Sequence, residues 1–291
     1  MSNGPSVMLR AESLSTGSWT FYEAVNVLCE EHYPMAFEKL KDLHIGFETS
    51  RRPFIKNYPT LVMIHGAGGS AQNWRSQIHL LKDSLNTLAL DLPGHGKTAG
   101  PGKARIDEYA QWLAEVLHAL FKEPVFLMGH SLGGAVVQET ALLYPELLKG
   151  IILVSTGPRL QVAPMFLEGL LNRFEETVDT IMKYAYGPDA DQSMVREGAK
   201  LMKAAGSTVV HGNFLACDQF DRRKDLGNID IPCLIICGDK DRLSPPALSK
   251  SLNQLIVGSK LRILASAGHM VMIESHKDFN KYVRDFIGKT N

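Results

Sequence analysis

The sequence has few cysteines and no excess of charge of either sign. Its 291 residues include only 4 cysteines, and Lys plus Arg equal Asp plus Glu at 31 each, so the formal net charge is zero. The cysteines are widely scattered, with no histidine pair at metal-ligand spacing beside them, which predicts free thiols and no metal site. A chain without net positive charge has no long-range attraction for nucleic acid or an anionic membrane. We therefore expect neither as a partner.

Long apolar runs are missing as well. No run approaches the roughly 20 residues that are needed to span a bilayer, and the N-terminus lacks the basic and apolar segments of an export signal. We therefore expect a cytoplasmic protein without a membrane span. The 45% hydrophobic content is enough for one large α/β domain or two small ones, and it does not indicate an oligomeric state.

Short apolar runs alternate with longer stretches of helical period. Residues 106–120, for example, repeat apolar side chains every three or four positions. This alternation predicts the α/β class, with a mostly parallel sheet flanked by helices. The expected strands are residues 61–64, 88–90, 125–128, 151–154, 234–237 and 261–264.

The alternation is interrupted at residues 158–225, which have helical period and no convincing strand. One apolar stripe is expected in this segment, and it consists of Leu167, Leu170, Leu171, Phe174, Val178, Ile181 and Met182. We therefore predict an all-helical insertion at 158–225 within a core formed by residues 43–157 and 226–291. Residues 1–42 are an N-terminal extension whose role the sequence does not indicate.

Residues 129–133 read Gly-His-Ser-Leu-Gly, directly after an expected strand and directly before a helical run. A serine at the tip of such a sharp turn needs glycine two positions away on both sides, because the neighbouring backbone comes too close for a Cβ. The turn exposes the Oγ of Ser131, a candidate nucleophile, and places the N–H of Leu132 at a helix start. The pattern alone is weak evidence, since a glycine-rich helix start with a capping serine looks the same.

A second glycine-rich loop at residues 65–69 follows the strand expected at 61–64. Acyl transfer builds negative charge on the carbonyl oxygen, and two fixed N–H donors usually stabilise it. The backbone amides of Ala67 and Leu132 are the candidates for this oxyanion hole.

The same loop also fits a dinucleotide-binding fingerprint. Gly66, Gly68 and Ala71 have the required spacing, and Asp91 follows at the end of the next strand. That alternative would make the protein an oxidoreductase, but it explains nothing after residue 91. Asp91 is also well placed to shape the turn that follows its strand.

A serine hydroxyl needs a base, and ten histidines compete for that role. His65, His95 and His130 lie in turn motifs, where local hydrogen bonds are the expected task. His269 instead follows the last expected strand and precedes the final helix, which places it at the carboxyl edge of the sheet, where active sites of open α/β sheets assemble. We predict that His269 is the general base.

The histidine needs a carboxylate to orient it. Asp239 and Asp241 both follow the strand expected at 234–237, and position alone leaves either of them open.

Taken together, these motifs resemble the α/β-hydrolase superfamily, over residues 43–157 and 226–291. The resemblance rests on 65–69 with Trp74, 91–96, 129–134, Gly238-x-x-Asp241-x-x-x-Pro245 and 267–269. In this family the spacing after Gly238 identifies Asp241, rather than Asp239, as the triad acid, and the chain order Ser, Asp, His is the expected one. The insertion at 158–225 is similar in placement to the family's cap over the active site.

The resemblance implies a serine hydrolase that needs no metal or organic cofactor. We expect Ser131, Asp241 and His269 to cleave an ester-like bond, in a carboxylic ester, thioester or lactone, through an acyl-enzyme intermediate. The family also contains carbon–carbon bond hydrolases, and a slow-turnover ligand receptor of the same fold is a further alternative. A small apolar substrate is expected because apolar residues in the insertion suggest a pocket, although packing within the cap explains them equally well: Met165, Phe166, Phe214, Leu215 and Cys217.

Overall fold

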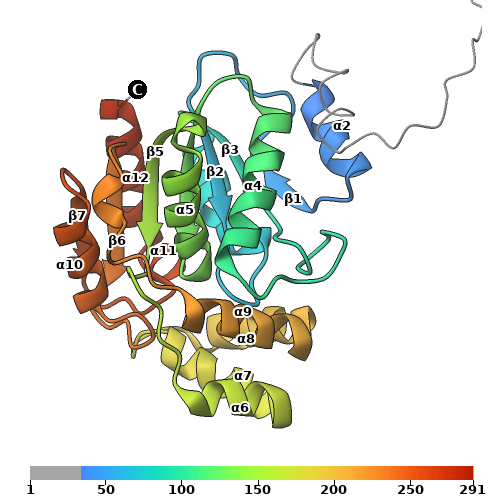
Figure 1. The fold of residues 1–291 in the computed structure, drawn as a ribbon, viewed down its shortest axis with the longest axis vertical. Helices are drawn as coiled ribbons and strands as arrows, with labels where there is room; N and C mark the ends of the chain where they lie inside the picture. The colour runs from blue at the N-terminus through green and yellow to red at the C-terminus, as the bar shows by residue number, and fades with distance from the viewer. Residues whose placement is uncertain (1–33, 291) are drawn as a thin grey trace, which may run out of the picture. The chain divides into compact units, whose positions relative to one another are not determined.

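A seven-stranded sheet organises the chain (Figure 1). The computed structural model describes residues 34–290, and its strand order is β1-β3-β2-β4-β5-β6-β7. Every neighbouring pair is parallel except β1 with β3, which confirms the predicted mostly parallel α/β sheet. The strands are β1 (Phe47–Thr49), β2 (Thr60–Ile64), β3 (Asn86–Leu90), β4 (Val125–His130), β5 (Leu148–Val154), β6 (Cys233–Gly238) and β7 (Lys260–Leu264).

The central strands are largely apolar and buried, as expected for strands with helices on both faces. Every residue of β3, β4 and β6 is buried. The edge strands β1 and β7 are partly exposed. Strand β1 was not predicted, since its three half-buried residues form no apolar run and are held as a strand only by pairing with β3.

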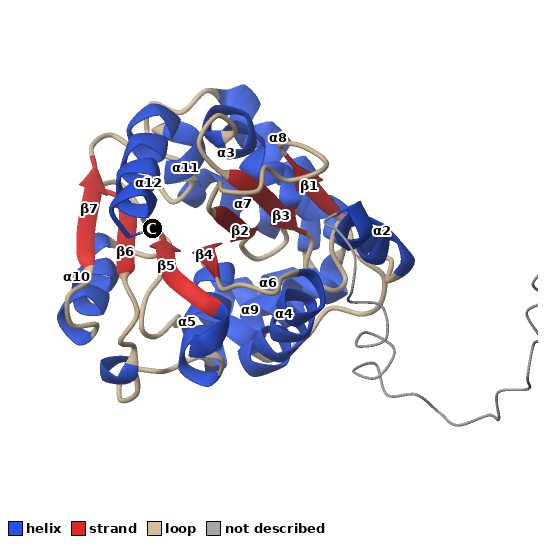
Figure 2. Ribbon diagram, turned by 90° about the horizontal axis from the view of Figure 1, so that it is seen from above, coloured by secondary structure: helices blue, strands red, loops and turns tan. Residues whose placement is uncertain are grey.

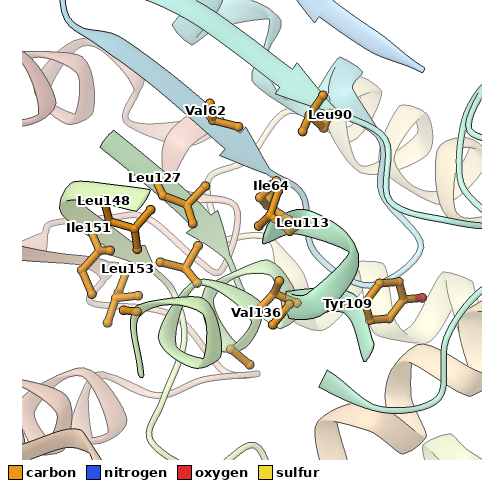
Figure 3. Packing of buried hydrophobic residues seen from close by; sticks show 14 of the residues in the cluster. Val62, Ile64, Leu90, Tyr109, Leu113, Leu127, Val136, Leu148, Ile151 and Leu153 are labelled. Atoms are coloured by element: carbon orange, nitrogen blue, oxygen red, sulfur yellow. The ribbon is translucent and has the colours of Figure 1, made fainter. Parts of the chain in front are cut away.

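Helices pack on both faces of the sheet (Figure 2). One face carries α4 (Ile106–Leu120), α5 (Leu132–Leu143) and α10 (Pro246–Leu255), and the other carries α3 (Arg75–Leu81), the short α11 (Val271–Glu274) and α12 (His276–Thr290). Figure 3 shows the first of these two layers, where Ile64 and Leu127 of the sheet belong to one buried cluster with Leu113 of α4 and Val136 of α5. The two buried layers thus enclose the sheet on both faces.

Four consecutive helices separate β5 from β6: α6 (Pro164–Asn172), α7 (Phe174–Ala185), α8 (Gln192–Ala205) and α9 (Ser207–Gln219). They lie together beyond the carboxyl ends of the central strands (Figure 1). Arg159 and Asp221 pair in an isolated antiparallel bridge, which brings the two ends of the segment together. The helical content of the predicted insertion is as expected, and its function as a cap stays a prediction.

The single apolar stripe expected across this segment is wrong. Helix α6 ends at Asn172 and α7 begins at Phe174, so the chain changes direction at Arg173. Within α6 itself, Leu170 is fully buried whereas Leu171 is 63% exposed, because adjacent residues of a helix point about 100° apart. Periodicity alone does not reveal such a break, because the apolar residues on either side keep their spacing.

The N-terminal extension predicted at residues 1–42 lies mostly outside the described residues. Its last part forms α2 (Pro34–Asp42), whose Phe37 and Leu40 are buried in the same cluster as α4. Cys217, Cys233 and Cys237 are free and buried, as predicted, and Cys29 lies outside the described residues. Within residues 34–290, no helix combines the length and apolar character that crossing a bilayer would require.

Candidate active site

Ser131 stands in a strained turn between β4 and α5. Its φ is 53° and its ψ is −116°, a backbone conformation that residues other than glycine rarely adopt. A Cβ on Gly129 would lie 2.1 Å from the carbonyl oxygen of Gly133, and one on Gly133 would lie 2.5 Å from that of His65. The backbone crowding expected around Ser131 is therefore present. The serine side chain makes no capping hydrogen bond, which removes the alternative of a capping serine.

The glycine-rich loop after β2 lies against Ser131. A Cβ on Gly66 would lie 3.2 Å from the Cβ of Ser131. Ala67 is in a tight turn that the amide of Gly69 closes by donating to the carbonyl of Gly66 at 3.0 Å. In the part of the chain that the structure describes, the amides of Ala67 and Leu132 donate to no protein acceptor. Both N–H groups thus remain available to an oxygen atom at the site.

His269 and Asp241 meet at the carboxyl edge of the sheet, after β7 and β6. Nδ1 of His269 is 2.9 Å from Oδ2 and 3.1 Å from Oδ1 of Asp241. Asp239 does not take this place, because its amide donates to the carbonyl of Leu264 and its carboxylate pairs with Lys240. The structure therefore brings Asp241, and not Asp239, to the histidine.

Three donors besides His269 hold the Asp241 carboxylate. Oδ1 accepts the amides of Leu243, at 2.9 Å, and Ser244, at 2.8 Å, and Oδ2 accepts the Ser244 hydroxyl at 2.8 Å. Burial disfavours the charge, but His269 and these donors outweigh burial and lower the pKa of Asp241. With an ionised acceptor at Nδ1, His269 carries its proton there and its Nε2 is free to accept another. Sequence reasoning missed Ser244, whose Oγ also lies 3.1 Å from Nδ1 of His269.

Ser131 and His269 line one cavity of about 380 Å³, together with Ala67. Within residues 34–290, Oγ of Ser131 has no hydrogen-bond partner, so serine and histidine share the cavity without a direct bond. Such bonds are often long in free enzymes and tighten when a substrate binds.

His130, next to the serine, ties the turn to the histidine loop. Its Nε2 donates to the carbonyl oxygen of His269 at 3.0 Å, and the two rings lie 4.6 Å apart. Burial, reinforced by His269, lowers the pKa of His130 to about 3, so the ring stays neutral. The local hydrogen bond expected for the turn histidines is therefore wrong for His130, because its partner is distant in the sequence.

The histidine loop is also held by the helical insertion. The carbonyl of Ala185, the last residue of α7, accepts the amide of His269 at 2.7 Å. Glu274 accepts the amide of Gly187 at 2.7 Å and that of Gly268 at 3.1 Å. Burial raises the pKa of Glu274 despite these amide donors. Sequence reasoning assigned no role to Glu274.

Asp91 has a structural task. Its Oδ1 accepts the amide of Ala71 at 2.7 Å and its Oδ2 accepts the amide of Lys97 at 2.9 Å, in a side chain that is almost fully buried. Both carboxylate oxygens are thereby engaged with backbone. The Asp91 carboxylate is thus buried and used to hold two backbone segments, rather than presented to a ribose hydroxyl as the dinucleotide alternative requires.

The walls of the cavity are largely apolar. Of the insertion residues expected there, Met165, Phe166, Phe214 and Cys217 line it and Leu215 does not. Among the lining residues, all of them within the described chain, Arg242 is the only Lys, Arg, Asp or Glu. Residues 34–290 contain no cluster of three or more His, Cys, Asp or Glu side chains that could hold a metal ion.

Known proteins resemble the chain over most of its length. The profile of the alpha/beta hydrolase fold family matches residues 59–276. The pimeloyl-(acyl-carrier protein) methyl ester esterase of Photobacterium profundum is 30% identical over 248 residues, which are 78% of this chain and 94% of that protein.

Solved structures agree with the sequence match. The structure of a thermophilic esterase is 30% identical, with a TM-score of 0.74, and the match covers 85% of this chain and 94% of that one. An enol-lactonase from Burkholderia xenovorans LB400 has the same fold at 21% identity, with a TM-score of 0.78 over 84% of this chain and 96% of that one. The predicted resemblance is confirmed, and this chain belongs to the α/β-hydrolase family as an enzyme of the esterase-like kind.

Proposed function

We propose that the protein is a serine esterase in which Ser131 is the nucleophile, His269 the general base and Asp241 the carboxylate that orients the histidine. The observation that carries this proposal is the hydrogen bond from Nδ1 of His269 to buried Asp241, in a histidine that shares a cavity with Ser131. That bond leaves Nε2 as the basic nitrogen on the side of the ring where a proton must be taken.

The reaction has two steps. Oγ of Ser131 attacks the ester carbonyl while Nε2 of His269 takes the hydroxyl proton, and the amides of Ala67 and Leu132 stabilise the negative oxygen of the tetrahedral intermediate. The intermediate collapses to an acyl-enzyme as His269 returns the proton to the leaving alcohol. Water then attacks the acyl group by the same route and releases the acid. No step requires a metal or organic cofactor.

The substrate we propose is a small ester with an apolar acyl group. The cavity of about 380 Å³ is lined mainly by apolar residues, many of them from α6, α7, α8 and α9, so these helices act as a cap that shapes the acyl pocket. Relatives named as methyl ester esterases support an ester rather than a carbon–carbon bond as the target. A cytoplasmic location stays a prediction.

A fluorophosphonate probe tests the nucleophile. We expect covalent labelling of the wild-type protein and none of Ser131→Ala. Labelling that persists in Ser131→Ala would assign the reactive group to another residue and contradict the proposal.

Turnover tests the enzyme class. The protein is assayed with aryl esters, thioesters and lactones whose acyl groups have matched lengths. We expect multiple turnovers with at least one ester. A single slow turnover with a ligand-dependent rise in melting temperature would instead favour a receptor of this fold. Cleavage of a carbon–carbon bond in preference to esters would favour that other class of hydrolase.

A further inference from the structure

A buried asparagine of the cap contacts the loop that carries one of the proposed oxyanion donors. Asn213 belongs to α9 and is fully buried. Its Oδ1 accepts the amide of Gly68 at 2.9 Å and lies 2.7 Å from Nε2 of His95. Its Nδ2 donates to the hydroxyl of Tyr109 on α4 at 2.9 Å. One side chain of the cap thus joins two core loops and a core helix.

The orientation of the Asn213 amide follows from its neighbours. The backbone N–H of Gly68 can only donate, so it must face Oδ1 rather than Nδ2. The Tyr109 hydroxyl already accepts the amide of Lys103 at 2.8 Å and can accept Nδ2 as well. Burial raises the pKa of Tyr109 to about 12, so its hydroxyl stays neutral. Burial also lowers the pKa of His95.

The direction of the Ala67 N–H depends on the two peptide groups that flank Ala67. The first contains the carbonyl of Gly66, which accepts Nδ1–H of His65 at 2.8 Å and the amide of Gly69 at 3.0 Å. Because a peptide group is planar and trans, the Ala67 N–H points away from this carbonyl and turns with it if the loop shifts. The second contains the N–H of Gly68, whose partner is Asn213. The core thus holds one flanking group and the cap holds the other.

The loop also packs directly on the cap. Gly68 has a φ of +62°, and a Cβ there would lie 2.6 Å from Cγ of Met202 in α8 and 3.1 Å from a methyl group of Val210 in α9. The turn and the two helices are therefore in direct van der Waals contact at this point. Any shift of α9 relative to the core must therefore move or release the Gly68 amide.

We propose that Asn213 is a positioning residue that fixes the oxyanion loop from the cap, so that the Ala67 N–H points at the reacting carbonyl oxygen only when α9 is seated on the core. This inference rests on the proposed function, because it assumes that Ala67 is an oxyanion donor. Without the Asn213 side chain, the amide of Gly68 would be buried without a partner, and the loop would lose one of its two anchors.

The test is the kinetics of Asn213→Ala on an aryl ester. We expect kcat to fall by roughly 10- to 100-fold, less than the ~10²–10³-fold loss for removing an oxyanion donor outright, while KM stays within about 2-fold. A trifluoromethyl ketone, which adds to the serine and places an oxyanion in the same site, should lose affinity by a similar factor. A residue that only stabilises the cap would change KM or the melting temperature without this parallel loss.

Tyr109→Phe is the matched control. It removes the hydroxyl that accepts from Asn213 but leaves both bonds to Oδ1, so kcat should stay within about 2-fold of wild type. An equal kcat loss in Tyr109→Phe, or full kcat and inhibitor affinity in Asn213→Ala, would overturn the inference. If Asn213→Ala does not fold, Asn213→Ser is measured with the same criteria.

Failure of this inference is distinguishable from failure of the proposed function. A wild-type protein that resists fluorophosphonate labelling would contradict the proposed function itself. Normal labelling and turnover in the wild type, with an unaffected Asn213→Ala, would contradict only the role of Asn213.

Discussion

The core and the proposed cap, helices α6 to α9, contribute to the cavity in different ways. Around Ser131, glycine positions are fixed by backbone atoms 2.1–2.5 Å from where a Cβ would lie, and neighbours such as Leu132 and Val136 are fully buried. In the cap, Met165 lines the cavity and yet is 64% exposed, and Leu171 on the same helix is 63% exposed. The groups proposed for the chemistry thus lie in crowded turns of the core, whereas the cavity wall formed by the proposed cap includes exposed side chains such as Met165.

This difference indicates a division of tasks. A reacting group must be held within a fraction of an ångström, whereas an apolar wall needs only the right volume. Substitutions in the core turns should therefore affect rate and folding, and substitutions in the cap should affect the choice of substrate.

The largest effect is expected for the triad acid. Asp241→Asn should lower kcat by about 10⁴-fold, because the amide no longer favours the Nδ1–H tautomer of His269. Asp239→Asn, a matched change on the same loop, should lower kcat less than about 5-fold, since Asp239 does not contact the histidine. Steady-state kinetics on an aryl ester measures both, and equal losses would show that the core loop as a whole, rather than one carboxylate, sets the rate.

Crowding around Ser131 is tested by adding a single methyl group. Gly133→Ala should lower the free energy of unfolding by about 1–3 kcal/mol, because its Cβ would meet two backbone oxygens, those of His65 and Ile64, at 2.5 Å. A Cβ on Gly288 in α12 would have no neighbour within 4 Å, so Gly288→Ala should raise the free energy of unfolding by up to about 1 kcal/mol. Denaturant titration gives both values. A well-tolerated Gly133→Ala would mean that the turn relaxes more easily than its contacts indicate.

The cap is tested by filling the cavity. Gly198 of α8 lines the cavity near Met182 and Tyr186, so Gly198→Leu should shorten the space for an acyl chain. We expect KM for an octanoyl ester to rise by about 10-fold, with an acetyl ester changed less than about 2-fold. Lys200→Leu places the same side chain on the exposed side of α8, and KM for both esters should stay unchanged. A loss of kcat on both esters would contradict the division between core and cap.

The smallest effect is expected where the two regions meet, at Glu274. The pKa of this carboxyl is raised in the folded protein, so folding favours its protonated form, and that contribution is lost as pH rises from the unfolded pKa through the folded one. The melting temperature of the wild type, relative to Glu274→Gln, should therefore fall as pH rises from about 4 to about 7. Glu168→Gln, on an exposed residue of α6, corrects for the lost charge. If the melting temperature of the wild type, relative to Glu274→Gln, rose with pH instead, the raised pKa of Glu274 would be contradicted.

Much of the fold could be predicted because its signals are local. Six of the strands are apolar runs of ordinary length, and the residues around Ser131 carry glycine where a Cβ cannot fit. The choice of Asp241 over Asp239 needed the family spacing, because both follow β6 closely and only the folded loop turns one of them toward His269.

The remaining contacts could not be predicted, because they join residues that are distant in sequence. Asn213 and Glu274 lie on helices whose patterns describe burial alone, and their partners Gly68 and Gly187 are glycines without any side-chain signal. Strand β1 and the break between α6 and α7 were missed because both are too short to change the apolar periodicity. Strand β1 has three residues, and the break consists of one residue.

The carbonyl of Ala185 has a consequence for protein engineering. Exchanging caps between relatives is a natural way to transfer substrate preference, and the obvious joints would be the two ends of the helical segment. A donor cap cut there would have to supply its own acceptor for the His269 amide, its own glycine for Glu274 and its own amide side chain for Gly68. A chimera that keeps Ala185, Gly187 and Asn213 from this chain, and replaces only the cavity-lining positions of α6 and α8, would avoid that requirement.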